Sequence, residues 1–597
     1  MQASSLTRRR WGERLAFRAA VLLGCLIVNL CLLVLVKRHF NAVFATNDDY
    51  RMRLIVSGAY TGAPSGQAVY LNILLGRALA GLYRAWPGVE WYGLFYYGTI
   101  YVFACVTDAL LLCRARKATD FFFRLGCVAL LSVVTLFNHL LMPQFTAVAA
   151  FWTALSVTAC LAFFDAGSRA GKLFWAALYV VSVFMAMLVR RMLFLMFLPM
   201  EVIFFLSHVL EEGIGRKARW RRAVLCLAVF GAACAAIVDC TAADYSANQS
   251  REYRDFLAFR DARGHLYDYS DWPDYEEDEA FYASIGVTQS AWDCLNARTF
   301  DINPDVNSET LEAVYDYARA RDDASLAQRL AQALAGGLDG LSIEQCVREV
   351  EVLALLLLLA FVVLRQAGAT PRTACILWGS FLYCAAALAG LLLMGRIMAR
   401  IVQSIAIVLI AVLFYLLGGM RLAPLDADRS PWTRLATLFK GCVAVLAALA
   451  VASSSVLWLT GEDEYRVGTL QRRTDELLAM EAYMADRPNE FLFYNALDFI
   501  GGSDYVFSEP REGTLNMDSL GNWNVFSPDY YARNAQFGFT SALDGLLNGR
   551  ALYARLHKLT PAPIEATLNE YGKTLVKIDE LEAAGDTIVI YRAVSLQ

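Results

Sequence analysis

The sequence predicts a polytopic α-helical membrane protein that ends in a small α/β domain. Of its 597 residues, 57% are hydrophobic and 18% are charged, whereas soluble chains have about 45–50% and about 25%. The apolar residues gather in runs of roughly 20, the length that crosses the bilayer as a helix. Two polar stretches, 241–346 and 460–597, lie outside these runs. The composition and a net charge of −4 exclude a disordered chain, a basic nucleic-acid binder and a secreted disulfide scaffold.

Eleven apolar runs are long enough to be interpreted as membrane spans. They are Leu15–Val36, Trp91–Cys113, Phe121–Leu141, Thr146–Phe164, Leu173–Val189, Met192–Val209, Ala223–Val238, Val347–Leu364, Ala374–Met394, Ile401–Leu417 and Gly441–Leu459. The first run is too long for a signal peptide and lacks a small-residue cleavage site, so we expect it to be retained. The run 68–82 is short and contains Arg77, which favours a helix at the membrane interface over a span.

Basic residues in the short loops predict the orientation. Clusters at 8–14, 114–117, 169–172 and 216–222 fall on one side of the predicted spans, and Lys and Arg in short loops mark the cytoplasm. The N-terminus is therefore expected inside a plasma membrane, and the C-terminus outside.

Four regions follow from this arrangement. They are an N-terminal membrane core at 1–240 with a first outer loop at 37–90, a large extracytoplasmic loop at 241–346, C-terminal membrane helices at 347–459, and an extracytoplasmic α/β domain at 460–597. The large loop holds 21 acidic and 8 basic residues and a helical pattern at 308–321. Cys294 and Cys346 face the oxidising side, where a bridge between them is an open alternative.

Asp48 and Asp49 are the first candidates for chemistry. They lie about ten residues beyond the outer end of the first span. A carboxylate there can take a proton from an attacking hydroxyl, and a carboxylate pair can hold a divalent cation such as Mg²⁺ or Mn²⁺. The alternative is an ordinary polar loop.

Arginines in two tight outer turns are the second candidates. Arg190 and Arg191 join one pair of spans, and Arg396 and Arg400 join another. Cations on the outer side oppose the usual charge bias, and a guanidinium fork fits a phosphate. The alternative is that these side chains reach outer-leaflet headgroups.

Several further polar or aromatic residues are expected to lie on the same side and to line a pocket there. They are Asn47, Tyr50, Tyr60, His139 and Gln144. His139 is expected to be a packing or gating residue, because no second His or Cys stands at ligand spacing. Asp108 and Glu201 fall inside spans and are interpreted first as helix-packing residues. Phosphate-loop, dinucleotide-binding, zinc-protease and nucleophile-elbow motifs are absent from the sequence.

Together, the first span followed by Asn47-Asp48-Asp49, the arginine-bearing outer hairpins and the C-terminal outer domain resemble the GT-C superfamily of integral membrane glycosyltransferases. These enzymes use polyprenyl-phosphate-linked sugars as donors. The resemblance implies that Asp48 or Asp49 is a catalytic base or metal ligand, and that Arg190, Arg191, Arg396 and Arg400 contact the donor phosphate. The oligosaccharyltransferase signature Trp-Trp-Asp is not matched, since the nearest stretch is 521–524.

The predicted function is therefore inverting sugar transfer to an acceptor hydroxyl, on a glycan or a lipid, in cell-envelope polysaccharide assembly. Two alternatives stay open. One is a surface-polysaccharide polymerase or ligase, which would depend more on arginines of a large outer loop. The other is a transporter or flippase for a lipid-linked glycan, which would need a polar path through the spans.

Overall fold

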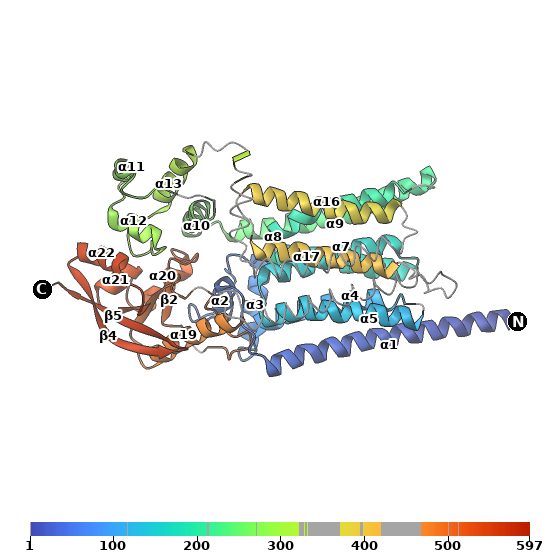
Figure 1. The fold of residues 1–597 in the computed structure, drawn as a ribbon, viewed down its shortest axis with the longest axis horizontal. Coiled ribbons are helices and arrows are strands. Elements are labelled where there is room, and N and C mark those ends of the chain that lie inside the picture. Colours follow the sequence, from blue (N-terminus) through green and yellow to red (C-terminus); the bar gives the residue numbers. More distant parts are fainter. Residues whose placement is uncertain are drawn as a thin grey trace, which may run out of the picture.

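The computed structural model consists of a bundle of long helices with a group of shorter helices and a β-sheet at one end (Figure 1). It describes residues 2–115, 117–211, 214–269, 272–321, 327–328, 331, 371–394, 398–419, 467–499, 501–511 and 513–596. The N-terminus lies at the far end of the bundle, and the C-terminus lies beyond the sheet (Figure 1). We call the end of the bundle that meets the sheet the domain end.

The helices of the bundle and the two short helices at its domain end come first. They are α1 (Gln2–His39), α2 (Asn47–Ser57), α3 (Ile73–Ala85), α4 (Trp91–Leu112), α5 (Ala118–Leu131), η1 (Ser132–Leu136), α6 (Phe137–Leu141), α7 (Phe145–Asp165), α8 (Arg169–Val209), α9 (Arg216–Ala247), α16 (Pro371–Leu393) and α17 (Ala399–Gly419). Beyond the domain end lie α10 (Arg251–Tyr269), α11 (Glu279–Ser284), α12 (Gln289–Asn296), α13 (Ser308–Ala320), α19 (Val467–Ala485), α20 (Pro528–Gln536), α21 (Ala542–Leu547) and α22 (Ala562–Glu570).

Seven described helices are long and apolar enough to cross a membrane. The predicted polytopic class is thereby confirmed, and every predicted span within the described residues coincides with helix. The predicted span 121–141 is divided into α5, a π-helical turn η1 and α6. The predicted spans 347–364 and 441–459 lie outside the described residues, so the predicted total of eleven stays a prediction.

Helix α8 is two antiparallel arms that meet at Arg190. Its φ and ψ of −155° and 90° are not helical. Tyr179 and Glu201, each eleven residues from Arg190, are joined by a 2.8 Å hydrogen bond from the tyrosine hydroxyl to the carboxylate. Such a contact between residues equally far from Arg190 requires the chain to reverse direction there. This reversal is the hairpin predicted at 189–192.

The segment predicted to lie at the interface contains α3, which at 13 residues reaches only about 20 Å and is too short to span. Asn72 begins the helix and accepts a hydrogen bond from the Leu74 N–H. The same residue donates from its backbone to the Leu188 carbonyl and from its side chain to the Cys240 carbonyl, both at 2.8 Å. Helix α3 is thereby fixed to the domain ends of α8 and α9.

The C-terminal domain is built on one five-stranded sheet. Its strands are β1 (Phe491–Asn495), β2 (Met517–Leu520), β3 (Ala551–Leu556), β4 (Lys573–Ala583) and β5 (Asp586–Ser595), in the order β2-β1-β3-β5-β4. Strand β1 pairs in parallel with β2 and β3, and β5 pairs antiparallel with β3 and β4. All five residues of β1 are buried, as expected for a strand covered on both faces. The predicted α/β character of this region is confirmed.

The C-terminal domain is joined to the loop after α1 through the backbone. Val43 and Tyr505 form an antiparallel bridge. The Phe44 N–H donates to the Asp504 carbonyl at 3.1 Å, and the Val506 N–H donates to the Ala42 carbonyl at 2.8 Å. Two backbone N–H groups and two backbone carbonyls that would otherwise be unpaired are satisfied across this junction.

Helix α2 adds buried ion pairs to the same junction. Arg51 pairs with Asp518, which also pairs with Arg533, and Arg53 pairs with Asp504 and, at 2.8 Å, with Glu90. All these side chains are nearly inaccessible to solvent. A buried charge that loses its partner costs about 3–5 kcal/mol, so α2 is stable in this place only when the C-terminal domain is docked on it.

We expect Arg51→Ala to lower the free energy of unfolding by about 3 kcal/mol, because it leaves Asp518 with one guanidinium fewer in a buried place. Denaturant titration of the purified protein in detergent measures this. Arg251→Ala is the control, because the Arg251–Asp255 pair is largely exposed and should be worth no more than about 1 kcal/mol. Equal effects of the two substitutions would contradict the structural role of Arg51.

Candidate functional site

Helix α2 presents the two candidate aspartates at its first turn. Thr46 is in an extended conformation before the helix, and acidic residues in a first helical turn are favoured by the helix dipole. The helix ends at Gly58, whose φ is +95° and where a Cβ would lie 2.8 Å from Pro64. Neighbouring residues in a helix point about 100° apart, so Asp48 and Asp49 have different surroundings.

Asp49 is buried and fully engaged in hydrogen bonds. Its Oδ1 accepts from the Tyr96 hydroxyl at 2.6 Å, the Tyr92 hydroxyl at 3.1 Å and the Phe145 N–H at 3.1 Å. Its Oδ2 accepts from the Thr46 hydroxyl at 2.6 Å. Burial raises the pKa of Asp49 to about 7, and the hydrogen bonds from Thr46, Tyr96 and Tyr92 act against that rise. Asp49 therefore joins α2 to α4 and to the start of α7.

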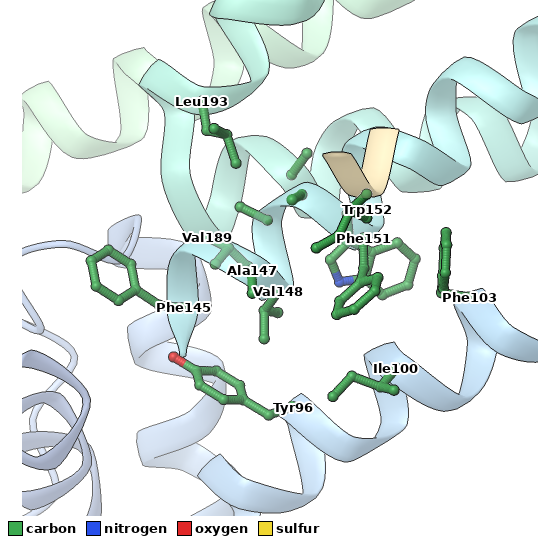
Figure 2. Close-up of a cluster of buried hydrophobic side chains, with 14 of the residues drawn as sticks. Tyr96, Ile100, Phe103, Phe145, Ala147, Val148, Phe151, Trp152, Val189 and Leu193 are labelled. Carbon is green, nitrogen blue, oxygen red and sulfur yellow. The ribbon is translucent and has the colours of Figure 1, made fainter. Parts of the chain in front are cut away.

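An apolar cluster lies directly beneath these hydrogen bonds. Figure 2 shows the Tyr96 hydroxyl pointing toward the start of α7 at Phe145, while Ile100, Phe103 and Phe151 pack further along the same helices. Because these neighbours are close-packed and buried, they hold the partners of Asp49 in place. We call Asp49, its hydrogen-bond partners and these packed side chains the platform of the site.

Asp48 points away from this platform toward guanidinium groups. Its side chain is 16% exposed, and its Oδ2 lies 3.8 Å from Nη1 of Arg400. Burial raises the pKa of Asp48, while the charges of Arg400, Arg190 and Arg263 act to lower it. A hydrogen bond from Trp523 also lowers it. Asp48 is thus a partly accessible carboxylate in a strongly cationic setting.

Arg190 is held at the turn of α8 by the start of α7. Its Nη1 donates to the Thr146 hydroxyl at 2.6 Å, and its guanidinium lies 4.7 Å from the centre of the Phe145 ring. The α7 and α17 helices both begin at this place, with Phe145 and Arg400 in their first turns. Helix N-termini carry partial positive charge and bind anions readily.

Two residues from outside the membrane bundle complete the surroundings of Asp48. Arg263 comes from α10 of the large loop, and Trp523 comes from the loop after β2. Tyr70 lies beside Trp523 and Asp48. The centre of its ring is 4.9 Å from that of the Trp523 ring, and its pKa is raised first by burial and then by the charge of Asp48. The Tyr70 ring also stacks on Phe145 at 5.6 Å. Together with the turn of α8 and the start of α17, five segments therefore meet at Asp48: these two, α10, the loop after β2 and the loop before α3.

The position of Trp523 depends on a close contact at Gly521. This glycine has a φ of +67°, and a Cβ on it would lie 1.4 Å from the Arg298 carbonyl oxygen. Its N–H donates to Asp301 at 2.8 Å. Burial raises the pKa of Asp301 to about 7. Only glycine fits here, so the large loop and the C-terminal domain approach each other closely just before Trp523.

The structure brings some of the predicted residues together and separates others. Asp48, Arg190 and Arg400 meet. Arg191 is exposed, and its charge acts on Asp244 of α9. Arg396 lies outside the described residues.

The predicted pocket residues are also divided. Tyr60 donates to Asp518 at 3.2 Å, and the Tyr50 ring lies 5.8 Å from the Arg511 guanidinium, so both belong to the junction with the C-terminal domain. His139 is buried, and its ring lies edge-on to that of Phe151. Gln144 is buried, and its Oε1 has no hydrogen-bond partner among the described residues.

Asn47 is exposed at the first position of α2, next to Asp48. Sequence reasoning missed Arg263, Trp523 and Tyr70 as site residues. The charged and aromatic residues at 260–269, interpreted from the sequence as an ordinary solvated surface, were a signal for the large loop.

The donor set around Asp48 does not fit a divalent cation. Both Asp49 oxygens already accept hydrogen bonds, and Asp48 faces guanidinium groups. Among the described side chains, no group of three or more His, Cys, Asp or Glu gathers as a metal site. Metal dependence stays a prediction from the sequence.

The two aspartates should respond differently to truncation. We expect Asp49→Ala to lower the free energy of unfolding by about 3 kcal/mol or more, because four buried donors lose their acceptor. Asp48→Ala should leave stability unchanged or raise it slightly, since it removes a desolvated carboxylate with no hydrogen bond to the platform. Thermal or denaturant unfolding of both variants measures the difference, and a larger loss for Asp48→Ala would contradict this division.

No family model matches the chain, and no curated protein matches its sequence. Solved structures similar to it include two of ArnT from Cupriavidus metallidurans. The one bound to undecaprenyl phosphate has 12% sequence identity and a TM-score of 0.38, and the similarity covers 96% of this chain and 97% of that one. The apo structure has 11% identity and a TM-score of 0.39, with 96% and 98% covered. The chain is thus similar to ArnT along nearly its whole length, at low identity.

Proposed function

We propose that this chain is a membrane glycosyltransferase of the GT-C type, which transfers a sugar from a polyprenyl-phosphate donor to an acceptor hydroxyl. The observation that carries the proposal is the meeting of one accessible carboxylate, Asp48, with the guanidinium groups of Arg190, Arg400 and Arg263. The proposal places this site at the extracytoplasmic face of a plasma membrane, with the N-terminus in the cytoplasm.

Asp48 is the proposed general base. Its pKa is raised by burial, and a base is most effective when its pKa approaches the working pH. Asp49 cannot serve in its place, because all of its accepted hydrogen bonds hold the fold together. The sequence left both aspartates open as the base, and the hydrogen bonds favour Asp48.

Arg190 and Arg400 are the proposed ligands of the donor phosphate. Three guanidinium groups around one carboxylate leave an excess of positive charge, which suits an anionic group. Guanidinium forks bind phosphate oxygens through paired, charge-assisted hydrogen bonds, and the N-termini of α7 and α17 add to the attraction. The lipid tail would lie along the bundle below.

The proposed reaction is a single displacement. Asp48 takes the proton of the acceptor hydroxyl as its oxygen forms a bond to the anomeric carbon. The bond from that carbon to the phosphate oxygen breaks, and its electron pair stays on the polyprenyl phosphate, where Arg190 and Arg400 stabilise the negative charge. Loss of one such stabilising donor costs about 10²–10³-fold in rate. Attack opposite the leaving group inverts the configuration.

One observation favours a second candidate, a surface-polysaccharide polymerase or ligase. Arg263 belongs to the large loop and acts on Asp48, and an enzyme of that kind would depend on such an arginine. If it is correct, Arg263→Gln should abolish activity while Asp48→Asn is tolerated. A transporter has less support, because the intramembrane Asp108 and Glu201 each accept hydrogen bonds from neighbouring helices at 2.8 Å.

We expect Asp48→Asn to lower sugar transfer at least 10²-fold while the protein still inserts and folds, because the amide cannot accept the proton. The assay is transfer from a panel of radiolabelled polyprenyl-phosphate sugars to added membrane glycans. For the wild type the rate should rise with pH through the pKa of Asp48, since only the ionised carboxylate is a base, and this limb should vanish in the variant. Arg191→Gln is the control, and wild-type transfer by Asp48→Asn would overturn the assignment.

A further inference from the structure

A pocket of about 170 Å³ lies beyond the Asp48 site. Three segments form it: the loop before α3, the junction of α9 with α10, and the loop that leads into α20. Its lining residues are Gln67, Ala247, Ser250, Glu252, Tyr253, Asn524, Ser527, Pro528 and Asp529. The pocket is therefore shared by the first outer loop, the large loop and the C-terminal domain.

The pocket and the Asp48 site are neighbours along each of these segments. Asn524 follows Trp523, and Gln67 is three residues before Tyr70, whose ring contacts Trp523. Helix α10 carries Tyr253 at the pocket and Arg263 near Asp48, which is about 15 Å along its axis. A ligand in the pocket would therefore lie close to the Tyr70 and Trp523 rings.

The chemistry of the pocket is the opposite of that around Asp48. Its lining has two carboxylates, two amides, two serine hydroxyls and a tyrosine, and no lysine or arginine. Phosphate is disfavoured by such a lining. Hydroxyl groups are favoured, because carboxylate and amide oxygens accept their hydrogen bonds and amide N–H groups donate to them. The aromatic ring supplies an apolar surface of the kind that binding pockets combine with a few polar groups.

One buried side chain of the lining, Asn524, has a donor without a partner in the described part of the chain, and a second, Asp529, is a partly buried carboxylate. Asn524 is 1% exposed, and its Nδ2 has no hydrogen-bond partner within the described residues, although it lies close enough to the Tyr60 hydroxyl to lower its pKa. Burial raises the pKa of Asp529, against which a hydrogen bond from Ser65 acts. Buried donors without acceptors are rare and costly, and a bound hydroxyl would satisfy this one.

We infer that this pocket binds a neutral, polyhydroxylated unit, a sugar ring of the acceptor. This inference rests on the proposed function and extends it. It identifies the acceptor as a glycan and assigns donor and acceptor to two adjoining sites. The arginines bind the anionic donor, and the carboxylate and amide pocket binds the uncharged acceptor sugar. The sugar ring in the pocket would be held beyond Trp523, while a hydroxyl of the neighbouring sugar in the same glycan reaches Asp48.

The test is direct binding of defined sugars to the full-length protein in detergent. Glucose, galactose, N-acetylglucosamine, maltose and lactose are titrated, with glucosamine and spermidine as cationic probes, and binding is followed by saturation-transfer NMR. At least one neutral sugar should bind the wild type. Asp529→Asn and Glu252→Gln together should weaken that binding about tenfold or more, because two charge-assisted hydrogen bonds are lost.

The matched control is Asp316→Asn with Glu312→Gln, since both of these carboxylates are exposed on α13. This control and Asp48→Asn should bind the sugar as the wild type does. Failure of every neutral sugar to bind, binding that the pocket variants leave unchanged, or binding of the cationic probes alone would overturn the inference. Sugar binding without any transfer from polyprenyl-phosphate donors would contradict the proposed function and would still support a sugar-binding pocket.

Discussion

The buried charges of α2 are the constraint on which the arrangement of this molecule depends. Within seven residues the helix buries one carboxylate, Asp49, and two guanidinium groups, Arg51 and Arg53. The carboxylate is satisfied by α4 and α7, whereas both arginines are satisfied mainly by the C-terminal domain. Since an unpaired buried charge costs several kcal/mol, α2 holds the membrane helices and the C-terminal domain in one relative position.

This constraint explains why a site forms beside α2. With one face of the helix fixed, Asp48 is left on the adjacent face, at the place where α7 and α17 begin and α8 turns. Arg190 and Arg400 are brought to it by the membrane helices, and Arg263 and Trp523 by the docked outer segments. The site is therefore complete only when both parts of the chain are assembled.

The charged groups around Asp48, to which we assign catalysis, are distinct from the charged groups that stabilise the fold. Asp49 is satisfied by hydrogen bonds, and Arg51 and Arg53 are paired with buried carboxylates, so these three groups stabilise the fold. Arg190 donates to the neutral Thr146 hydroxyl, and Arg400 lies 3.8 Å from Asp48. A phosphate would offer both guanidinium groups paired, charge-assisted hydrogen bonds.

Much of the architecture could be predicted from the sequence, because bilayer thickness sets the length of apolar runs and short continuous apolar runs in the polar C-terminal stretch indicate strands. The outer hairpin at Arg190 was predicted from a short polar break between two such runs. Local pattern also drew attention to Asp48 and Asp49, although their different roles depend on a 100° difference in direction that no pattern of two like residues reveals.

The rest of the site depends on contacts between distant segments. Trp523 lies 475 positions after Asp48, and its place is set by the close approach of Gly521 to Arg298. Tyr50 and Tyr60 were predicted to line the pocket because they follow the aspartates, yet they pack against Arg511 and Asp518. Sequence proximity is a weak guide where a docked domain decides which residues are covered.

The most direct test of the central claim is the binding of a polyprenyl phosphate to the full-length protein. Undecaprenyl phosphate in detergent micelles should bind the wild type, and Arg190→Gln or Arg400→Gln should each weaken it about tenfold or more through loss of a charge-assisted contact. Arg191→Gln, one position along the same turn, should bind as the wild type does. Equal affinity for all four proteins, or a loss confined to Arg191→Gln, would contradict the account.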